Sequence, residues 1–183
     1  MKRIGSITLI MLLASCLLAS CSSAPAATPT KSPGELSLDM PSVCLTMEEG
    51  LCIVSPPGAS FGGGKTTVIK QKPTAAFLND TSAIQIKVGD WTLVFDPGES
   101  TPFSVGMTFP NAKLYPQGND VGMAVEENGN KCDPLEGEFV DDILQTAQSG
   151  EKQINPISGL DIRFSMRCNG EPLALQGRVK LSQ

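Results

Sequence analysis

The chain has 183 residues, with 14 basic, 19 acidic and no histidine residues, which gives a net charge of −5. An acidic chain is poorly suited to bind nucleic acid or an anionic lipid surface. The lack of histidine removes the Ser-His-Asp triad, the usual general base and a common metal ligand. We therefore expect neither nucleic-acid binding nor histidine-based catalysis, and we predict no cofactor.

Residues 1–20 are predicted to be a secretory signal. Lys2 and Arg3 give a cationic start, residues 4–18 are mostly apolar, and small residues then lead to Cys21. The apolar span is short for a membrane-crossing helix, which needs about 20 predominantly apolar residues. The Leu-Ala-Ser-Cys sequence that ends at Cys21 matches the bacterial lipobox, in which the cysteine receives a diacylglyceryl group before cleavage.

The same four letters also end at Cys16. Cleavage there would leave Leu17 and Leu18 at the mature terminus, whereas a polar segment follows Cys21, so we predict lipidation of Cys21. Two or three acyl chains hold a protein stably on a membrane, which predicts a lipid-anchored location at the cell envelope. Ser22 favours the outer membrane in a bacterium with two membranes, and otherwise we expect the outer face of the plasma membrane. The alternative is an ordinary signal peptide with a chance cysteine.

Residues 21–41 are predicted to be the lipidated cysteine and a flexible tether, because Ser, Ala, Thr and Pro recur there. Residues 42–183 then form one folded domain. Its four cysteines indicate two disulfides in an exported protein, with three possible pairings. We favour Cys44–Cys52 and Cys132–Cys168 over free thiols, and no C-x-x-C spacing supports zinc.

Alternation of apolar and polar residues predicts the strands of this domain. They cover residues 66–71, 83–88, 91–95, 160–166 and 175–181. Gly89-Asp90 is expected to form a tight turn, and the last two strands are expected to pair antiparallel. Residues 140–147 lack a clean period, and we prefer a strand to a short helix. The prediction is an all-β fold, a single antiparallel β-sandwich that is jelly-roll-like.

Two motifs favour structural over functional interpretations. Residues 59–66 fit a loose phosphate-loop pattern, but they lead into an expected strand where nucleotide binding needs a helix. We predict a glycine-rich turn there and no nucleotide. Trp91 heads an alternating strand, so we expect it in the core and not on a sugar-binding face.

Two groups of acidic residues have two interpretations each, as a functional site or as ordinary solvated surface. Calcium prefers hard oxygen ligands, and the candidates around one turn are Glu126, Glu127, Asn128 and Asp133. Glycoside hydrolysis needs paired carboxylates, and the candidates are Glu136, Glu138, Asp141 and Asp142. The calcium candidates lack the EF-hand spacing, and no pattern places the carboxylates in a cleft. We predict no metal site and no catalytic residue.

Segments in a fixed order resemble an uncharacterised family of domains in secreted bacterial proteins. The patterns are P-G-x-x-[IF]-G-x-G at residues 57–64, W-x-L-x-F at 91–95, C-[ND]-x-L-x-G-x-F at 132–139 and C-x-G-x-x-x-A-L-x-G at 168–177. The resemblance implies a β-sandwich and supports a disulfide between Cys132 and Cys168. Arg167 stands where the family has histidine, and the resemblance supplies no catalytic residues.

The leading functional hypothesis is a lipid-anchored envelope lipoprotein that presents a non-catalytic binding or structural module. Its partners would be the membrane, through lipid on Cys21, and an envelope protein or glycan. One alternative is a carboxylate-dependent hydrolase of envelope or extracellular glycans. The other is a periplasmic ligand carrier, which would need a sizeable apolar cavity inside the fold.

Overall fold

The computed structural model describes residues 36–78, 82–99, 101–116, 118–133, 135–146 and 157–183. The predicted signal, Cys21 and most of the predicted tether lie outside these residues. The chain divides into residues 1–30 and residues 31–183, and the second unit is described by itself. Among its described residues no helix is long and apolar enough to cross a membrane.

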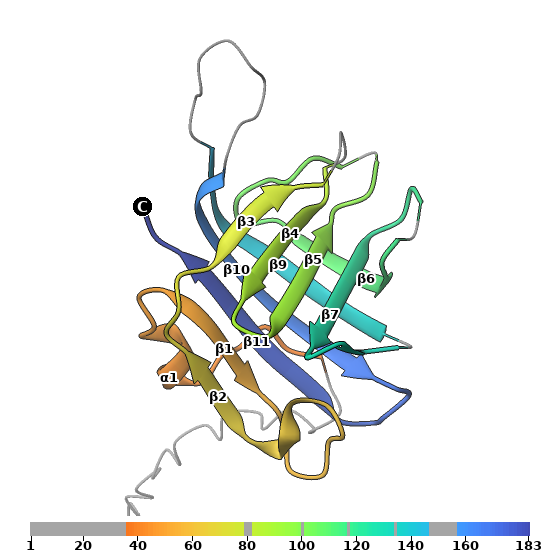
Figure 1. Ribbon diagram of the computed structural model, residues 1–183. Helices are drawn as coiled ribbons and strands as arrows, with labels where there is room; N and C mark the ends of the chain where they lie inside the picture. The colour runs from red at the N-terminus through yellow and green to blue at the C-terminus, as the bar shows by residue number, and fades with distance from the viewer. Residues whose placement is uncertain (1–35, 79–81, 100, 117, 134, 147–156) are drawn as a thin grey trace, which may run out of the picture. The chain divides into compact units, whose positions relative to one another are not determined.

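One sheet accounts for the described domain (Figure 1). Its strands are β1 (Gly50–Val54), β2 (Thr66–Ile69), β3 (Thr74–Phe77), β4 (Ile84–Val88), β5 (Trp91–Asp96), β6 (Thr108–Leu114), β7 (Gly122–Glu127), β8 (Asn130–Lys131), β9 (Leu135–Thr146), β10 (Ile157–Cys168) and β11 (Ala174–Leu181). The helical pieces are α1 (Ser42–Leu45) and the short 3₁₀ turn η1 (Gly62–Gly64). The hydrogen-bonded path runs β2-β1-β11-β10-β9-β6-β7-β5-β4-β3, with β8 paired to β7.

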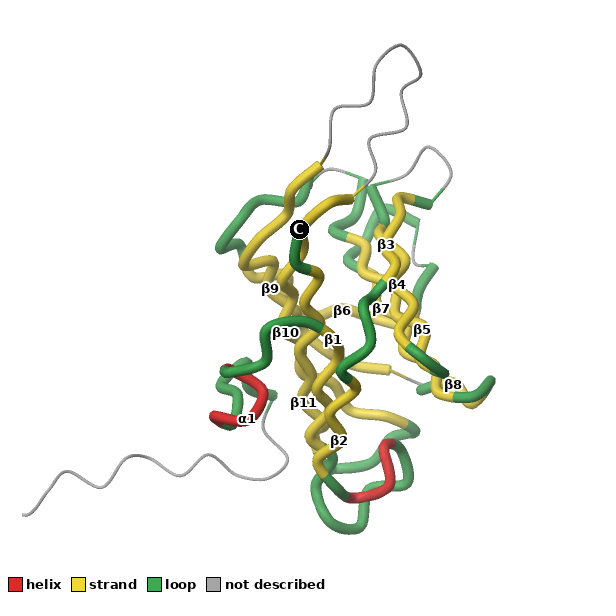
Figure 2. The backbone as a smooth tube through the Cα atoms, turned by 60° about the vertical axis from the view of Figure 1, so that its left-hand side comes forward, coloured by secondary structure: helices red, strands yellow, loops and turns green. Residues whose placement is uncertain are grey.

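The sheet curls until its two halves face each other across one core. Phe95 on β5 contacts Phe139 on β9 and Phe164 on β10, with ring centroids 5.1 and 5.5 Å apart. In the path, β6 and β7 separate β5 from β9, so these contacts cross the interior. Figure 2 shows β4 and β5 on one side and β10 and β11 on the other.

The all-β prediction is confirmed, while the predicted antiparallel, jelly-roll-like sandwich is not. The described strands form one continuous sheet, a half-barrel, in which β6 and β7 run parallel. Alternation along a strand reports which side chains are buried. It does not report whether the strand at the edge of one layer continues into the other, which is the property that separates a curled sheet from a sandwich.

The strands predicted from alternation are confirmed. Strand β4 pairs with β5 across the Gly89-Asp90 turn, and β10 pairs antiparallel with β11, with Ile162 opposite Val179. Residues 140–146 belong to the long strand β9, as preferred over a helix. The alternating apolar side chains of β10, Leu160, Ile162, Phe164 and Met166, are all buried.

The glycine-rich segment is a turn, as predicted. Gly62, Gly63 and Gly64 all have positive φ, between 65° and 75°, a region that glycine enters without steric cost. Strand β2 follows directly, so the helix that a phosphate loop requires is replaced by a strand. Phe61 before the turn meets the ring of Trp91 edge-on at 5.7 Å, and Trp91 is buried, which confirms its predicted place in the core.

Candidate functional site

Residues 36–47, here called the strap, lie on the outer face of the sheet. Figure 2 shows α1 on the side of β10 and β11 that faces away from β4 and β5. Ser37 and Met40 are buried, with 6% and 9% of their surface exposed. Ser37 and Met40, which fall in the predicted tether of residues 21–41, thus pack against the folded domain.

Polar side chains of β10 and β11 hold the first half of the strap. The Ser37 amide donates to Ser165 Oγ at 3.0 Å, and Gln176 Nε2 donates to the carbonyls of Ser37 and Asp39 at 2.8 and 2.9 Å. Arg163 Nη1 donates to the carbonyl of Leu38 at 3.1 Å. These contacts give hydrogen-bond partners to backbone N–H and C=O groups of a segment that has no strand partner among the described residues.

Arg178 holds the second half of the strap. Its Nη1 donates to the carbonyls of Cys44 and Leu45 at 2.8 and 2.7 Å. These carbonyls belong to the last turn of α1, where a helix leaves acceptors unsatisfied and favours positive charge. Nε and Nη2 of the same guanidinium donate to both carboxylate oxygens of Asp161 at 2.8 and 2.6 Å. Hydrogen bonding to Asp161 raises the pKa of Arg178.

A second ion pair lies next to the first. Arg163 donates through Nε and Nη2 to the two carboxylate oxygens of Asp142, which is half-buried. This contact raises the pKa of Arg163. The pattern of alternating charges on β10 was visible in the sequence at residues 161, 163 and 167. Its role in holding residues 36–47 was missed, because that role depends on which strand lies beside β10.

Asp141 is the unusual group of this region. Its side chain is fully buried, and neither carboxylate oxygen has a hydrogen-bond partner among the described residues. The pairing of β9 with β10 shifts register at this point, as at a β-bulge. Burial first, and then the nearby carboxylates of Asp142 and Asp161, raise the pKa of Asp141 to about 6 against the opposing effect of the Ile143 backbone. Its own carbonyl accepts the amide of Gly106 at 2.6 Å.

The four carboxylates proposed for hydrolysis do not form an open acidic pair. Glu136 is exposed and pairs with Lys113 at 3.0 Å and with Arg167 at 3.9 Å, and the hydrogen bond from Lys113 lowers the pKa of Glu136. Asp142 is engaged by Arg163, and Asp141 is buried. Glu138 lies opposite Ser165 on β10.

The calcium candidates are also placed. Glu126 and Glu127 are consecutive on β7, so their side chains leave opposite faces of the sheet. Asn128 forms the following turn with φ of 50°, and the amide of Asp133 donates to Asn169 Oδ1 at 3.2 Å. Within the described residues, no group of three or more His, Cys, Asp or Glu side chains is arranged to hold a metal ion.

Both favoured disulfides are present. Cys44–Cys52 joins the strap to β1, and Cys132–Cys168 joins the segment before β9 to the end of β10. Near the second disulfide, Asn169 donates to Ser60 Oγ at 3.3 Å, and the amide of Ser60 donates to Glu171 at 3.2 Å. The segments that carry the family resemblance at residues 57–64, 132–139 and 168–177 therefore meet at one end of the sheet.

The described residues border several surface cavities. One of about 630 Å³ lies between α1 and β2 and includes Val43, Glu48 and Val68. One of about 730 Å³ lies beside β3, and one of about 470 Å³ lies by Arg167 and Glu171. Each is bordered by charged side chains. Comparisons with protein-family models, with curated proteins and with solved structures found no match to this chain, so the resemblance described above stays a prediction.

Proposed function

We propose that this chain is a lipoprotein of the bacterial cell envelope, anchored by lipid on Cys21, whose described domain is a non-catalytic binding or structural module. The observation that carries the proposal is the strap. In the strap, Ser37 is held by Ser165 and Gln176, and Cys44 is held by Arg178. A domain held by its N-terminal side benefits from a firm attachment at that point.

The cysteines support export. Cys44, Cys52, Cys132 and Cys168 are all buried and all paired, and structural disulfides persist in oxidising compartments outside the cytoplasm. Cys21 precedes the described residues and is the cysteine that ends the lipobox sequence. In this proposal the domain is a β-sandwich, and the two facing halves of the curled sheet are its layers.

The charges support a non-catalytic role over hydrolysis. A hydrolase needs two carboxylates that face one substrate cleft. Here Asp142 and Asp161 are each bound by an arginine, and Glu136 is bound by Lys113 and Arg167. Asp141, whose raised pKa is typical of catalytic acids, is closed off from solvent. A ligand carrier would instead use a cavity inside the core.

The anchor is tested by changing Cys21 to Ala in the full chain, with Cys16→Ala as the matched control. We expect Cys21→Ala to lose lipid labelling and to leave the membrane fraction or keep its signal, while Cys16→Ala behaves as wild type. Unchanged labelling and membrane association of Cys21→Ala would contradict the anchor. The binding role is tested by crosslinking in intact cells, where failure to capture any envelope protein or glycan would count against it.

A further inference from the structure

Strand β3 is one end of the sheet, so one of its two edges is open. Among the described strands it pairs with β4 alone. The amide of Leu78 donates to the carbonyl of Ala83 at 2.8 Å, which makes residue 78 a hydrogen-bonded position of the antiparallel pair. Such positions alternate along an antiparallel strand. Ala75 and Phe77 therefore direct their N–H and C=O groups away from β4.

A cavity of about 730 Å³ lies along this open edge. Thr74 and Ala75 border it on one side, and Ile157 and Leu181 border it on the other. Ile157 and Leu181 are core residues that keep 7% of their surface exposed. The cavity thus combines backbone donors and acceptors, which recognise an extended chain, with apolar side chains, which receive the residues of that chain.

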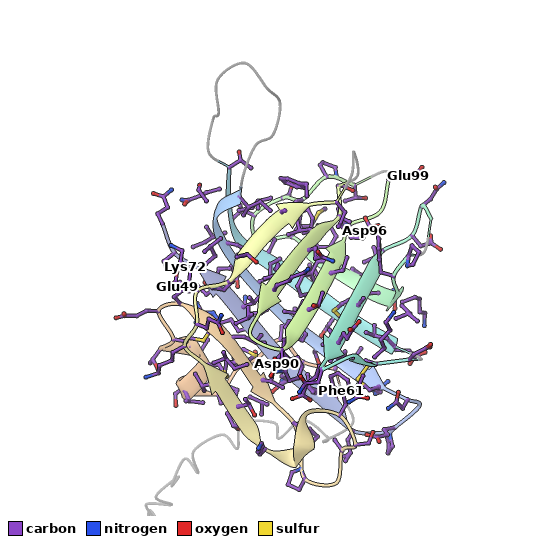
Figure 3. All side chains as sticks on the ribbon, viewed as in Figure 1. Glu49, Phe61, Lys72, Asp90, Asp96 and Glu99 are labelled. Carbon is purple, nitrogen blue, oxygen red and sulfur yellow. A yellow bond between two sulfur atoms is a disulfide. The ribbon has the colours of Figure 1, made fainter. Side chains whose placement is uncertain are left out.

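The charged side chain that borders the β3 cavity is a lysine. Lys72 is the one charged side chain among the described residues that border the cavity. Its side chain is 61% exposed, pairs with Glu49 at 3.7 Å and donates to the carbonyl of Ser182 at 3.2 Å. Figure 3 shows Lys72 beside Glu49. Lys87 lies opposite Thr74 on β4 and is exposed. These lysines stand out in a chain with 19 acidic and 14 basic residues.

Strand β2, at the other end of the sheet, also has an open edge, but the side chains near it carry different charges. Thr66 and Val68 are its outward positions, because Lys65 accepts the amide of Ser55 and the pattern alternates from there. The cavity beside β2 carries Glu48 and Glu49 as well as Lys70. An acidic chain would meet two carboxylates there and none from the side chains that border the β3 cavity.

We propose that the open edge of β3 binds an extended acidic segment of a partner protein, which adds to the sheet as a further strand. The proposal rests on the binding role proposed above and gives it a place and a chemistry. Lys72 precedes the edge strand and Lys87 lies on the neighbouring strand β4. Lysines this close to an edge hinder pairing with a second copy of the same chain, because like charges meet. The same lysines attract glutamate and aspartate, so they select a foreign acidic strand over self-association.

The test titrates the purified full chain with a blocked peptide of alternating Glu and Val, and with the same peptide carrying Lys for Glu. We expect the Glu peptide to bind at least about tenfold more tightly. Hydrogen exchange should show new protection of the amides of Ala75 and Phe77. Equal binding of both peptides, no binding of the Glu peptide, or protection at Thr66 and Val68 instead would each overturn the proposal.

Two variants make the test specific. Ala75→Pro removes an outward N–H without touching a hydrogen bond to β4, and it should abolish binding of the Glu peptide. Lys72→Glu with Lys87→Glu should weaken binding by about tenfold or more, whereas Lys131→Glu on β8 should not. If crosslinking in cells succeeds while the Glu peptide fails, the edge is wrong and the binding role stands. If the peptide binds but no envelope partner is captured, the edge is right and the envelope role fails.

Discussion

Arg178 on β11 and Asp161 on β10 share two hydrogen bonds, at 2.8 and 2.6 Å, across a diagonal of the sheet, because Asp161 lies two residues from Arg163, the residue opposite Arg178. The same guanidinium reaches the carbonyls of Cys44 and Leu45. One side chain therefore links two strands of the sheet to the last turn of α1. Both partners are buried, which makes this pair costly to break from one side.

We predict that Arg178→Met destabilises the domain by about 3–5 kcal/mol, because it leaves the Asp161 carboxylate buried without its partner. Urea unfolding measures the change. Adding Asp161→Leu should recover much of the loss, since it removes the orphaned charge. Lys113→Ala, which breaks the exposed pair with Glu136, is the control and should leave the unfolding midpoint nearly unchanged. Equal effects of Arg178→Met and Lys113→Ala would contradict the prediction.

Stability should fall with rising pH because of Asp141. Its pKa is raised from 3.8 to about 6 in the folded domain, chiefly by burial. Between these values the folded state holds a proton that the unfolded state has released, so the stability present below about pH 4 is lost as pH rises through about 6. The side chain of Asp141→Asn cannot ionise. The free energy of unfolding of this variant should therefore exceed that of wild type by about 3 kcal/mol above that pH range, and should match it near pH 4.

Urea midpoints across this pH range test the effect, with Glu138→Gln on the same strand as control. The difference between wild type and Asp141→Asn isolates the effect of this one carboxyl from that of the other acidic groups. If Asp141→Asn is less stable than wild type at pH 8, the side chain has a favourable charged contact and the assignment is wrong.

Gly177 has no room for a side chain, because the ring of Phe164 lies against it. A Cβ at this position would overlap the side chain of Phe164 on the facing strand β10. Phe164 is fully buried and contacts Phe95, so it has little room to move. We predict that Gly177→Ala costs about 1–3 kcal/mol through overpacking, as measured by chemical unfolding. The double variant with Phe164→Leu should be less destabilised than the two single changes added together, which a double-mutant cycle detects.

The two disulfides should contribute unequally. Their cysteines are separated by 8 residues in Cys44–Cys52 and by 36 in Cys132–Cys168. In the chain-entropy model these loops correspond to about 2.5 and about 4 kcal/mol. Paired serine variants, unfolded in urea without reductant, should rank in that order. Limited proteolysis should cut the strap faster in Cys44→Ser/Cys52→Ser than in Cys132→Ser/Cys168→Ser, and the reverse ranking would contradict the attachment described for residues 36–47.

The local elements could be predicted because each is encoded by neighbouring residues. Ile84, Ile86 and Val88 alternate with polar residues, and a glycine follows them at the turn, so β4 needs no knowledge of the rest of the chain. The cysteine pairing could be favoured because Cys44 and Cys52 are close enough in the sequence to close a short turn, while the family resemblance supported a disulfide between Cys132 and Cys168.

The sheet order and the strap could not be predicted in the same way. Ser37 lies in a stretch rich in Ser and Pro, and it is buried only because Ser165 and Gln176 come together on adjacent strands. The roles of Arg163 and Arg178 depend on the same adjacency. Sequence alternation predicted that they leave the core face, but not that another segment covers them.

The pairing of β1 with β11 sets an order of events for a chain made from its N-terminus. The strap and Cys44 emerge first, whereas Gln176 and Arg178, which hold them, come last. The strap therefore cannot dock fully until β11 has been made. A product cut short before residue 174 keeps the N-terminal segment but lacks β11, so secure attachment of this segment reports that β11 has been made and paired.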